Sequence, residues 1–434
     1  MNILMMTNTF SPHVGGVARS VEAFTSEYRK RGHRVLVVAP IFENMPEKEG
    51  DVVRVPAIQH FSGSDFSVVL PIPGGLLSKV ETFKPDIIHS HHPFLIGATA
   101  LRIAHVYEIP LVFTHHTMYE QYTHYVPGDS KALQRFVIRL TTSYANLCDQ
   151  VFAPSDSTAL VLRERQIRSP IDVVPTGVSL QQFSLGSGPG FRAAMDIPED
   201  AFVVGHLGRL APEKNLPFLT EALAAFLKRE KRAHFLVVGT GPLHGAIRDF
   251  FAGQNLSSRL HVAGNLTQPL LASAYRAMDV FAFASKSETQ GMVLIEAMAV
   301  GTPVIALDAP GSREVVVDGS NGLLLHSETV AEFSSALQRV ASFPRKRIKE
   351  LKENAYHRAE LFTMERSTDK ALSLYGRLLK KDFEHRDEEY DAWSTVLRLI
   401  KTEWDLLKGV VEGGARRRSF YPGRGGKGPL DLSR

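Results

Sequence analysis

Two glutamates, Glu288 and Glu296, stand eight positions apart, and the second lies in the middle of an apolar helical run. An unpaired buried charge is costly, so Glu296 requires a hydroxyl, an amide or a cation beside it. Glu288 lies just before this helix, where backbone N–H groups and the positive end of the helix dipole favour a bound anion. The pattern predicts a pocket for a sugar joined to a nucleotide, with further contacts from the helix start at Gln290, Gly291, Met292 and Val293.

Two cations, Arg209 and Lys214, lie five residues apart directly after the first expected strand of the second half of the chain. Open α/β sheets bind ligands at such strand ends. The planar guanidinium and the compact ammonium together can grip a diphosphate and neutralise it as a leaving group. The alternative reading is an ordinary solvated turn.

Glycines follow the first strand of each half. Gly15 and Gly16 open the first helix, where backbone N–H groups can approach a phosphate or sugar closely. A structural tight turn explains this pair equally well. The full fingerprint of three spaced glycines is missing, so the sequence does not support a nicotinamide cofactor.

Histidines gather after two strands. His115 and His116 follow an apolar strand, and His89, His91 and His92 form a second cluster at the preceding strand end. A metal pair is disfavoured because no Asp or Cys ligand is spaced nearby and adjacent side chains diverge. We expect one histidine of the tandem to bind a sugar hydroxyl and the other to be satisfied structurally.

No metal or other cofactor is expected. The Asp-any-Asp pair that holds a divalent cation in many sugar-transferring enzymes occurs nowhere in the chain. Charge on a leaving group must then be met by Arg209, Lys214 and a helix end.

Length and composition indicate a globular protein of two domains. The chain has 434 residues, 44% hydrophobic and 22% charged, which exceeds the usual size of a single core. One cysteine, no signal-peptide pattern and no long apolar stretch predict a cytoplasmic protein, with any membrane contact peripheral. The net charge of +4 is mild, and no nucleic-acid partner is expected. The sequence predicts no oligomeric state.

Short β-branched runs alternate with amphipathic helical stretches, which is typical of parallel sheets covered by helices. Glycine and proline at 175–178 and 185–190 indicate a linker between two such sheets, and the chain becomes helical after about residue 330. The expected strands are 2–6, 34–39, 52–55, 87–89, 111–114, 150–153 and 172–174 in the first half, then 202–207, 234–238, 260–263, 280–284, 303–306 and 322–325 in the second.

The tail carries an apolar helical stripe followed by a basic segment rich in Gly and Arg, as an in-plane membrane anchor requires. Packing of the stripe on the protein's own N-terminal domain is the alternative. Basic residues at 131, 135 and 139 share one helix face that suits an anionic bilayer, although a solvated charged face is the usual explanation. The stripe consists of Trp393, Val396, Leu397, Ile400, Trp404, Leu407 and Val411.

In chain order, these motifs resemble the retaining glycosyltransferases of family four, and the resemblance runs from residue 1 to about 380. It implies an α/β fold of two Rossmann-like parallel-sheet domains facing across a cleft (GT-B), with a C-terminal helical extension. The motifs are Gly15-Gly16, His116, Arg209 with Lys214, residues 239–242, Glu288 with Glu296, and residues 310–314 followed by Asp318-Gly319 and Gly322.

The resemblance implies roles and boundaries. Residues 1–183 form the acceptor-side domain, 184–363 the nucleotide-sugar-binding domain, 364–385 a helix crossing back to the first domain, and 386–434 the amphipathic helix and basic tail. The expected catalytic residues are His116 near the reacting carbon, Glu288 beside the donor sugar, and Arg209 with Lys214 on the diphosphate. Glu296 holds the ribose hydroxyls, and further donor contacts come from Gly15, Gly16, Gly241, Asn265 and residues 290–293.

The segment 114–125, Thr-His-His-Thr-Met-Tyr-Glu-Gln-Tyr-Thr-His-Tyr, is similar to that of bacterial diacylglycerol glucosyltransferases. This similarity implies transfer of a hexose, with UDP-glucose as donor, to a membrane lipid at the inner face of the plasma membrane. His115, where an aromatic residue is common, and the long tail depart from the pattern. The alternatives are a soluble sugar, a glycan or phosphatidylinositol as acceptor, a nucleotide-sugar epimerase, and a scaffold that binds nucleotide sugars without turnover.

Overall fold

The computed structural model describes residues 1–13, 15–46, 49–58, 68–69, 75–125 and 130–381. In these residues two parallel sheets, each covered by helices, follow one another along the chain, which confirms the expected fold class. The described residues within 1–118 and 141–381 form one compact unit that contains both sheets. We call its part up to residue 174, together with 364–381, the first lobe, and residues 179–362 the second lobe.

The first sheet has seven strands in the order β3-β2-β1-β6-β7-β8-β9. All of its pairings are parallel, and its central strands are buried on both faces, as helix-covered parallel strands require. A separate antiparallel pair, β4 (Ala57–Ile58) with β5 (Val68–Val69), was not expected from the sequence. The strands of the sheet are β1 (Asn2–Met6), β2 (Arg34–Pro40), β3 (Val52–Val55), β6 (Ile87–Ser90), β7 (Leu111–Thr114), β8 (Gln150–Ala153) and β9 (Ile171–Val173).

Helices cover the first sheet. α1 and α14 pack together on one face and share a core with Ile3, Val37 and Phe152. α3 contacts the central strands β1, β6 and β7. The helices of this lobe are α1 (Gly16–Lys30), α2 (Gly75–Phe83), α3 (Ile96–Val106), α5 (Asp156–Glu164) and α14 (Met364–Leu378).

The second sheet has six parallel strands in the order β12-β11-β10-β13-β14-β15. The chain reverses its direction of strand addition between β10 and β13, and such a switch point leaves a crevice at the carboxyl ends of the two strands. The strands are β10 (Phe202–Leu207), β11 (Ala233–Val238), β12 (Leu260–Val262), β13 (Val280–Phe283), β14 (Val304–Leu307) and β15 (Gly322–Leu325).

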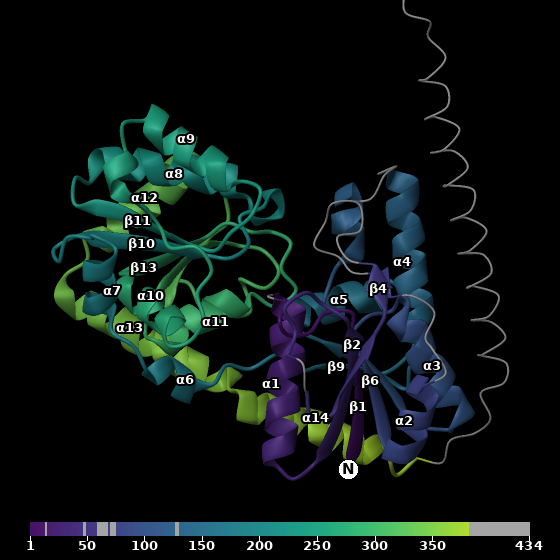
Figure 1. Cartoon of the computed structure of the whole chain (residues 1–434). Helices are drawn as coiled ribbons and strands as arrows, with labels where there is room; N and C mark the ends of the chain where they lie inside the picture. The colour runs from purple at the N-terminus through teal and green to yellow at the C-terminus, as the bar shows by residue number, and fades with distance from the viewer. Residues whose placement is uncertain (14, 47–48, 59–67, 70–74, 126–129, 382–434) are drawn as a thin grey trace, which may run out of the picture. The chain divides into compact units, whose positions relative to one another are not determined.

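Two apolar cores lie on opposite faces of the second sheet. α8 (Leu216–Arg229), α9 (His244–Gly253) and α12 (Val330–Ala341) cover one face, and α7 (Gly188–Ala194), α10 (Leu270–Ala277), α11 (Met292–Ala299) and α13 (Arg345–Ala359) cover the other (Figure 1). The short α6 (Leu180–Ser184) contacts α10 and α11.

The expected linker at 185–190 is wrong in its second half, because α7 begins at Gly188. The Ser187 hydroxyl accepts from the amide of Gly190, and Pro189 occupies the first turn, where its missing N–H costs nothing. Phe191 is buried in the core of the second lobe. Serine and proline therefore mark a helix start here.

The chain passes between the lobes twice, and the two crossings are hydrogen bonded to each other. The amide of Val178 donates to the carbonyl of Phe362 at 2.9 Å, and the amide of Met364 donates to the carbonyl of Val178 at 3.1 Å. Thr363 then caps α14, which returns to the core of the first lobe.

The described residues 119–125 and 130–140 belong to a second unit. Its described part contains η2 (Tyr119–Tyr125) and the start of α4 (Lys131–Asn146), on which Lys131, Arg135 and Arg139 are exposed. The predicted amphipathic stripe and basic tail lie outside the described residues. Within the described residues, no helix is both long and apolar enough to cross a membrane.

Candidate active site

The loops after β10 and β13 meet at the switch point of the second sheet. The first loop contains η3 (Pro212–Lys214) and ends at Asn215, whose φ of 54° turns the chain into α8. The Asn215 side chain donates to the carbonyl of Ala284, and the carbonyl of Glu213 accepts from the hydroxyls of Ser285 and Ser287. These bonds hold the two loops together.

Lys214 and Glu288 come into contact across these loops. The Lys214 ammonium donates to Glu288 Oε1, and each side chain is 19% exposed. Arg209 Nη1 lies 3.8 Å from Glu213 Oε1 and is held within its own loop. The switch point thus brings Lys214 and Glu288 into contact. Arg209 precedes Lys214 by five residues in the same loop. This arrangement offers positive charge to a phosphate and a carboxylate to its neighbour.

Glu296 is buried in α11 with the partners that its position requires. The Tyr275 hydroxyl donates to Oε2 at 2.8 Å, and Arg19 Nη1 donates to Oε1 at 3.1 Å. The residue is only 6% exposed, which confirms that it is buried. The Tyr275 hydroxyl and the Arg19 guanidinium confirm that a buried Glu296 has a hydroxyl and a cation beside it. Burial, and then the Glu296 charge, raises the pKa of Tyr275 well above its ordinary value. A ribose at this carboxylate would share it with Arg19 or displace Arg19.

The turn before α11 is tightly packed. Gly291 has φ 71°, and a Cβ there would lie 2.6 Å from the carbonyl oxygen of Gly311. Gly291, Met292 and Val293 open the helix, where amides have no intrahelical partner and can bind an anion. Gln290, by contrast, uses its side chain to bind the backbone of Thr176. Its Oε1 accepts from the amide of Thr176 at 2.7 Å, and its Nε2 donates to the carbonyl of Thr176 at 2.5 Å. Its side chain holds the crossing between the lobes.

The predicted residues Gly241 and Asn265 lie on loops stacked beside the cation loop. A Cβ at Gly241 would come within 2.5 Å of the carbonyl oxygen of Leu210. The amide of Leu210 donates to the carbonyl of Thr240, whose hydroxyl bonds Asn265 Oδ1 at 3.2 Å. The loops after β10, β11 and β12 therefore form one layer next to Arg209.

His116 of the first lobe lies beside the turn before α11. Its carbonyl accepts from the Thr289 hydroxyl at 2.8 Å, and its Nε2 lies 2.8 Å from Nδ1 of His91. Burial holds the pKa of both imidazoles well below the ordinary value, and so both rings are neutral at neutral pH. His115 is buried, with 1% of its surface exposed.

Gly15 and Gly16 lie at the start of α1, in the same helix as Arg19. A Cβ at Gly16 would meet no described atom within 4 Å. Packing within the described chain therefore does not require glycine at this position. Open space beside a helix start is what the predicted diphosphate contact needs.

His206, which the sequence did not indicate as part of the site, is buried close to Lys214 and Glu288. Its Nδ1 lies 3.1 Å from the carbonyl of Ala282, which only an N–H can satisfy, and its Nε2 is buried with no hydrogen-bond partner among the described residues. Burial lowers its pKa to about 4, with the charges of Lys214 and Glu288 close enough to contribute. A single histidine inside an apolar strand gives no sequence signal, because its neighbours across the sheet identify it only after folding.

No group of three or more His, Cys, Asp or Glu side chains that could hold a metal ion occurs among the described residues.

Comparison with known proteins identifies the family. Residues 14–182 match the model described as Glycosyltransferase Family 4, and residues 201–342 match Glycosyl transferases group 1. The chain is 32% identical to the D-inositol 3-phosphate glycosyltransferase of Actinosynnema mirum, over 67% of this chain and 72% of that protein. The chain belongs to glycosyltransferase family 4. It is a glycosyltransferase.

Two further similarities support the same family and fold. The alpha-monoglucosyldiacylglycerol synthase of Streptococcus pneumoniae is 28% identical over 76% of both chains. The structure of Anabaena HepE in complex with UDP-glucose aligns with a TM-score of 0.68 at 20% identity, covering 87% of this chain and all of HepE. This similarity establishes the GT-B fold of the family 4 glycosyltransferase.

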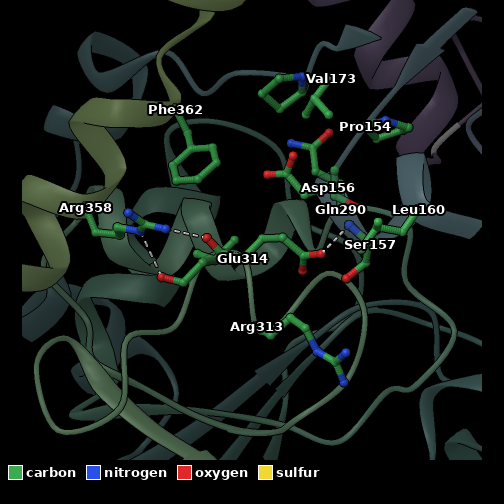
Figure 2. Close-up of a pocket in the computed structure, with 13 residues that line it drawn as sticks. Pro154, Asp156, Ser157, Leu160, Val173, Gln290, Arg313, Glu314, Arg358 and Phe362 are labelled. Carbon is green, nitrogen blue, oxygen red and sulfur yellow. Dashed lines mark hydrogen bonds between the residues drawn. The ribbon is translucent and has the colours of Figure 1, made fainter. Parts of the chain in front are cut away.

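A cavity of about 450 Å³ adjoins this site (Figure 2). Gln290 and Glu314 line it, and the Glu314 carboxylate accepts from the amide of Ser157 at 2.9 Å. Arg358, also in the lining, donates to the backbone carbonyls of Glu314 and Val315. The expected catalytic residues His116, Arg209, Lys214 and Glu288 do not line this cavity.

Proposed function

We propose that this glycosyltransferase moves glucose from UDP-glucose to a hydroxyl of a membrane lipid, diacylglycerol, with retention of anomeric configuration. The observation that carries the proposal is the convergence of Lys214, Glu288 and the start of α11 at the switch point of the second sheet. A diphosphate bound there meets an ammonium group and the helix-start amides, which have no intrahelical partner. The adjoining sugar meets a carboxylate.

Glu296 supports a nucleotide at the same place. It is the buried carboxylate of the helix that starts at the proposed phosphate site, and carboxylates accept from ribose hydroxyls. Its present partner Arg19 belongs to α1, whose start carries the predicted diphosphate contacts Gly15 and Gly16. Binding of a nucleotide would rearrange this ion pair.

The transfer needs no nucleophile from the protein. The bond from the anomeric carbon to the diphosphate oxygen breaks as the bond to the acceptor oxygen forms on the same face. The acceptor proton passes to the departing diphosphate oxygen. Arg209 and Lys214 neutralise the charge that develops on the leaving group, and the helix start adds its dipole. His116 binds a hydroxyl of the donor sugar next to the reacting carbon.

The acceptor assignment rests on two supports. The segment 114–125 resembles that of diacylglycerol glucosyltransferases, and a relative named alpha-monoglucosyldiacylglycerol synthase is similar over most of both chains. Lys131, Arg135 and Arg139 are exposed on α4, and each basic residue close to anionic lipid contributes about 1 kcal/mol to binding. The site of action is then the inner face of the plasma membrane.

A soluble acceptor is the second candidate. The relative named D-inositol 3-phosphate glycosyltransferase is 32% identical, so a phosphorylated polyol, a sugar or phosphatidylinositol is a reasonable competitor for the acceptor position. An epimerase or a non-catalytic binder uses no acceptor at all.

A two-way screen tests the proposal. Purified protein is given UDP-glucose, GDP-mannose or UDP-N-acetylglucosamine, each with anionic vesicles containing diacylglycerol, with phosphatidylinositol vesicles, or with inositol phosphate. Nucleotide release and the glycosylated product are measured. We expect product from UDP-glucose and diacylglycerol, with the α-anomer identified by NMR. Product only with inositol phosphate would replace the lipid assignment, and an epimer formed from donor alone would replace transfer.

Sedimentation with vesicles tests the membrane surface separately. The full chain and a chain ending at residue 385 are spun with anionic and with neutral vesicles. We expect binding to the anionic vesicles, weakened by salt and by the triple variant K131Q/R135Q/R139Q. Equal recovery of all proteins in the supernatant would remove the lipid-surface argument while leaving the donor site untouched.

A further inference from the structure

His91 lies next to the proposed donor-binding histidine. Its backbone amide follows β6 and donates to the carbonyl of Met6 in β1 at 2.9 Å. The residue is 1% exposed, and its ring lies against the ring of His89, with 4.2 Å between centroids. His89 is itself fixed by the hydroxyls of Tyr375 at 2.5 Å and Thr114 at 2.7 Å. The ring of His91 therefore has little freedom to turn.

The contact between His91 and His116 has room for only one N–H hydrogen between the two facing nitrogens. Nδ1 of His91 and Nε2 of His116 are 2.8 Å apart, and the two rings are inclined by 25°. Two neutral imidazoles can share only one N–H at that distance. Either His91 donates through Nδ1 or His116 donates through Nε2.

The other nitrogen of His91 decides between these arrangements. Nε2 of His91 is buried and has no hydrogen-bond partner among the described residues. If His116 were the donor, the proton of His91 would sit on this Nε2 as an orphaned buried N–H. Such groups are rarer in folded proteins than acceptors left without a donor. If His91 donates, its Nε2 is only a bare lone pair.

We propose that His91 is a positioning residue that donates its Nδ1–H to His116 and thereby fixes the proton of His116 on Nδ1. Among the described residues no group bonds Nδ1 of His116, so this N–H is available to a ligand. The choice of ring nitrogen in a functional histidine is commonly set by the bond that the other nitrogen makes. His116 then offers a hydrogen-bond donor to a hydroxyl oxygen of the donor sugar, which rests on the role of His116 in the proposed function.

The chain supplies a matched control pair in the second lobe. Nδ1 of His234 lies 2.9 Å from Nε2 of His261, with ring centroids 5.2 Å apart. These two histidines lie on β11 and β12, outside the site described above. The same substitution at His234 therefore removes an equivalent contact without touching His116.

The test uses the full chain labelled with ¹⁵N-histidine, and the variants H91N, H91F and H234F. Asparagine places an amide N–H close to the position of Nδ1, whereas phenylalanine keeps a ring without a donor. Imidazole ¹⁵N shifts report the protonated nitrogen of His116, whose signals are identified by their loss in H116N. Nucleotide release with acceptor reports turnover.

We expect His116 to carry its proton on Nδ1 in the parent protein, in H91N and in H234F, and to become a mixture of both tautomers in H91F. Loss of one hydrogen bond to the sugar corresponds to a change of up to about 10-fold, so turnover should fall by up to that factor in H91F alone.

A proton on Nε2 of His116 in the parent protein, or equal turnover in H91F and H234F, would overturn the proposal. If the tautomers behave as expected but H116N transfers at the parent rate, the assignment of the proton survives and the sugar contact in the proposed function fails.

Discussion

Lys214 is the residue whose charge the proposed reaction uses most directly. Its ammonium contacts Glu288 at the switch point and is four-fifths buried, so a phosphate there would meet a poorly screened cation. K214A should lower the turnover number on a nucleotide sugar by about 100-fold or more, the usual cost of losing a preorganised transition-state contact. Initial rates of nucleotide release at saturating donor measure this effect.

The matched control is K228A. Lys228 is exposed near the end of α8, where its ammonium bonds the Gln254 side chain, and its loss should leave turnover unchanged. Undiminished turnover in K214A would remove the diphosphate clamp from the mechanism.

His206 makes the stability of the second lobe sensitive to acid. Burial lowers its pKa to about 4, whereas the unfolded chain titrates at the ordinary value of 6.5. Between these values the unfolded state binds more protons, so the free energy of unfolding falls as the pH drops from about 6.5 toward 4 and gains nothing above 6.5.

For a shift of this size the linkage amounts to about 2 kcal/mol between pH 7 and pH 5. Urea unfolding at both pH values, followed in the parent protein and in H206F, measures it. The variant should lose less stability on acidification than the parent. Parallel declines in the two proteins would show that His206 accepts its proton as readily when folded as when unfolded.

The sequence predicted part of the site at this scale. Lys214 and Glu288 are each expected after a strand of the second half, and the structure brings them into contact because the ends of neighbouring parallel strands meet. The pairing of Arg19 with Glu296 could not be predicted, because 277 positions separate the two residues and neither local sequence indicates the contact. The apolar neighbours of Glu296 in the sequence predict that it needs a partner, and only the folded structure identifies Arg19 and Tyr275 as the partners.

Among the elements, α11 depends on the turn that starts it. Gly291 has φ 71°, a region that costs other residues about 1–2 kcal/mol, and a Cβ would lie 2.6 Å from the carbonyl oxygen of Gly311. G291A should therefore displace the turn that carries Glu288 and the amides of the helix start. We expect a raised KM for the donor and a lower melting temperature.

Gly253 provides a control of opposite sign. It is the last residue of α9, and a Cβ there would meet no described atom within 4 Å. G253A should leave the KM unchanged and raise stability by up to about 0.5–1 kcal/mol, the helical preference of alanine over glycine. If both variants left donor affinity intact, the tight start of α11 would not be what shapes the site.

Element boundaries were predictable where one local rule acts alone. The strands flanking the switch point begin at the expected residues because an apolar run starts at each of them. Glycine and proline in the segment 185–190 predict a linker, but Ser187 and Pro189 are also residue types that begin helices. The two readings share residue types, and only the burial of Phe191 against the second lobe separates them.

At the scale of the whole molecule, α14 returns to the lobe that contains β1. α14 starts after the second crossing, yet Leu374 and Tyr375 are buried with Ile3 and Val37 in the core of the first lobe. The Tyr28 hydroxyl donates to the Tyr375 hydroxyl at 3.0 Å. The sequence alone showed a helix here but not its packing surface, and its expected return to the first domain came from the family resemblance.

This return makes the first lobe depend on residues far along the chain, and a cavity in α14 tests that dependence. Leu374 is 2% exposed, so L374A should cost about 2–5 kcal/mol of unfolding free energy. Hydrogen exchange should accelerate in β1 and β2 and stay unchanged in β10.

The matched control is L379A. Leu379 is 39% exposed, so this substitution should change the free energy of unfolding by less than about 0.5 kcal/mol. Faster exchange in β10 with β1 protected would mean that α14 stabilises the second lobe instead, and that the first lobe is complete without it.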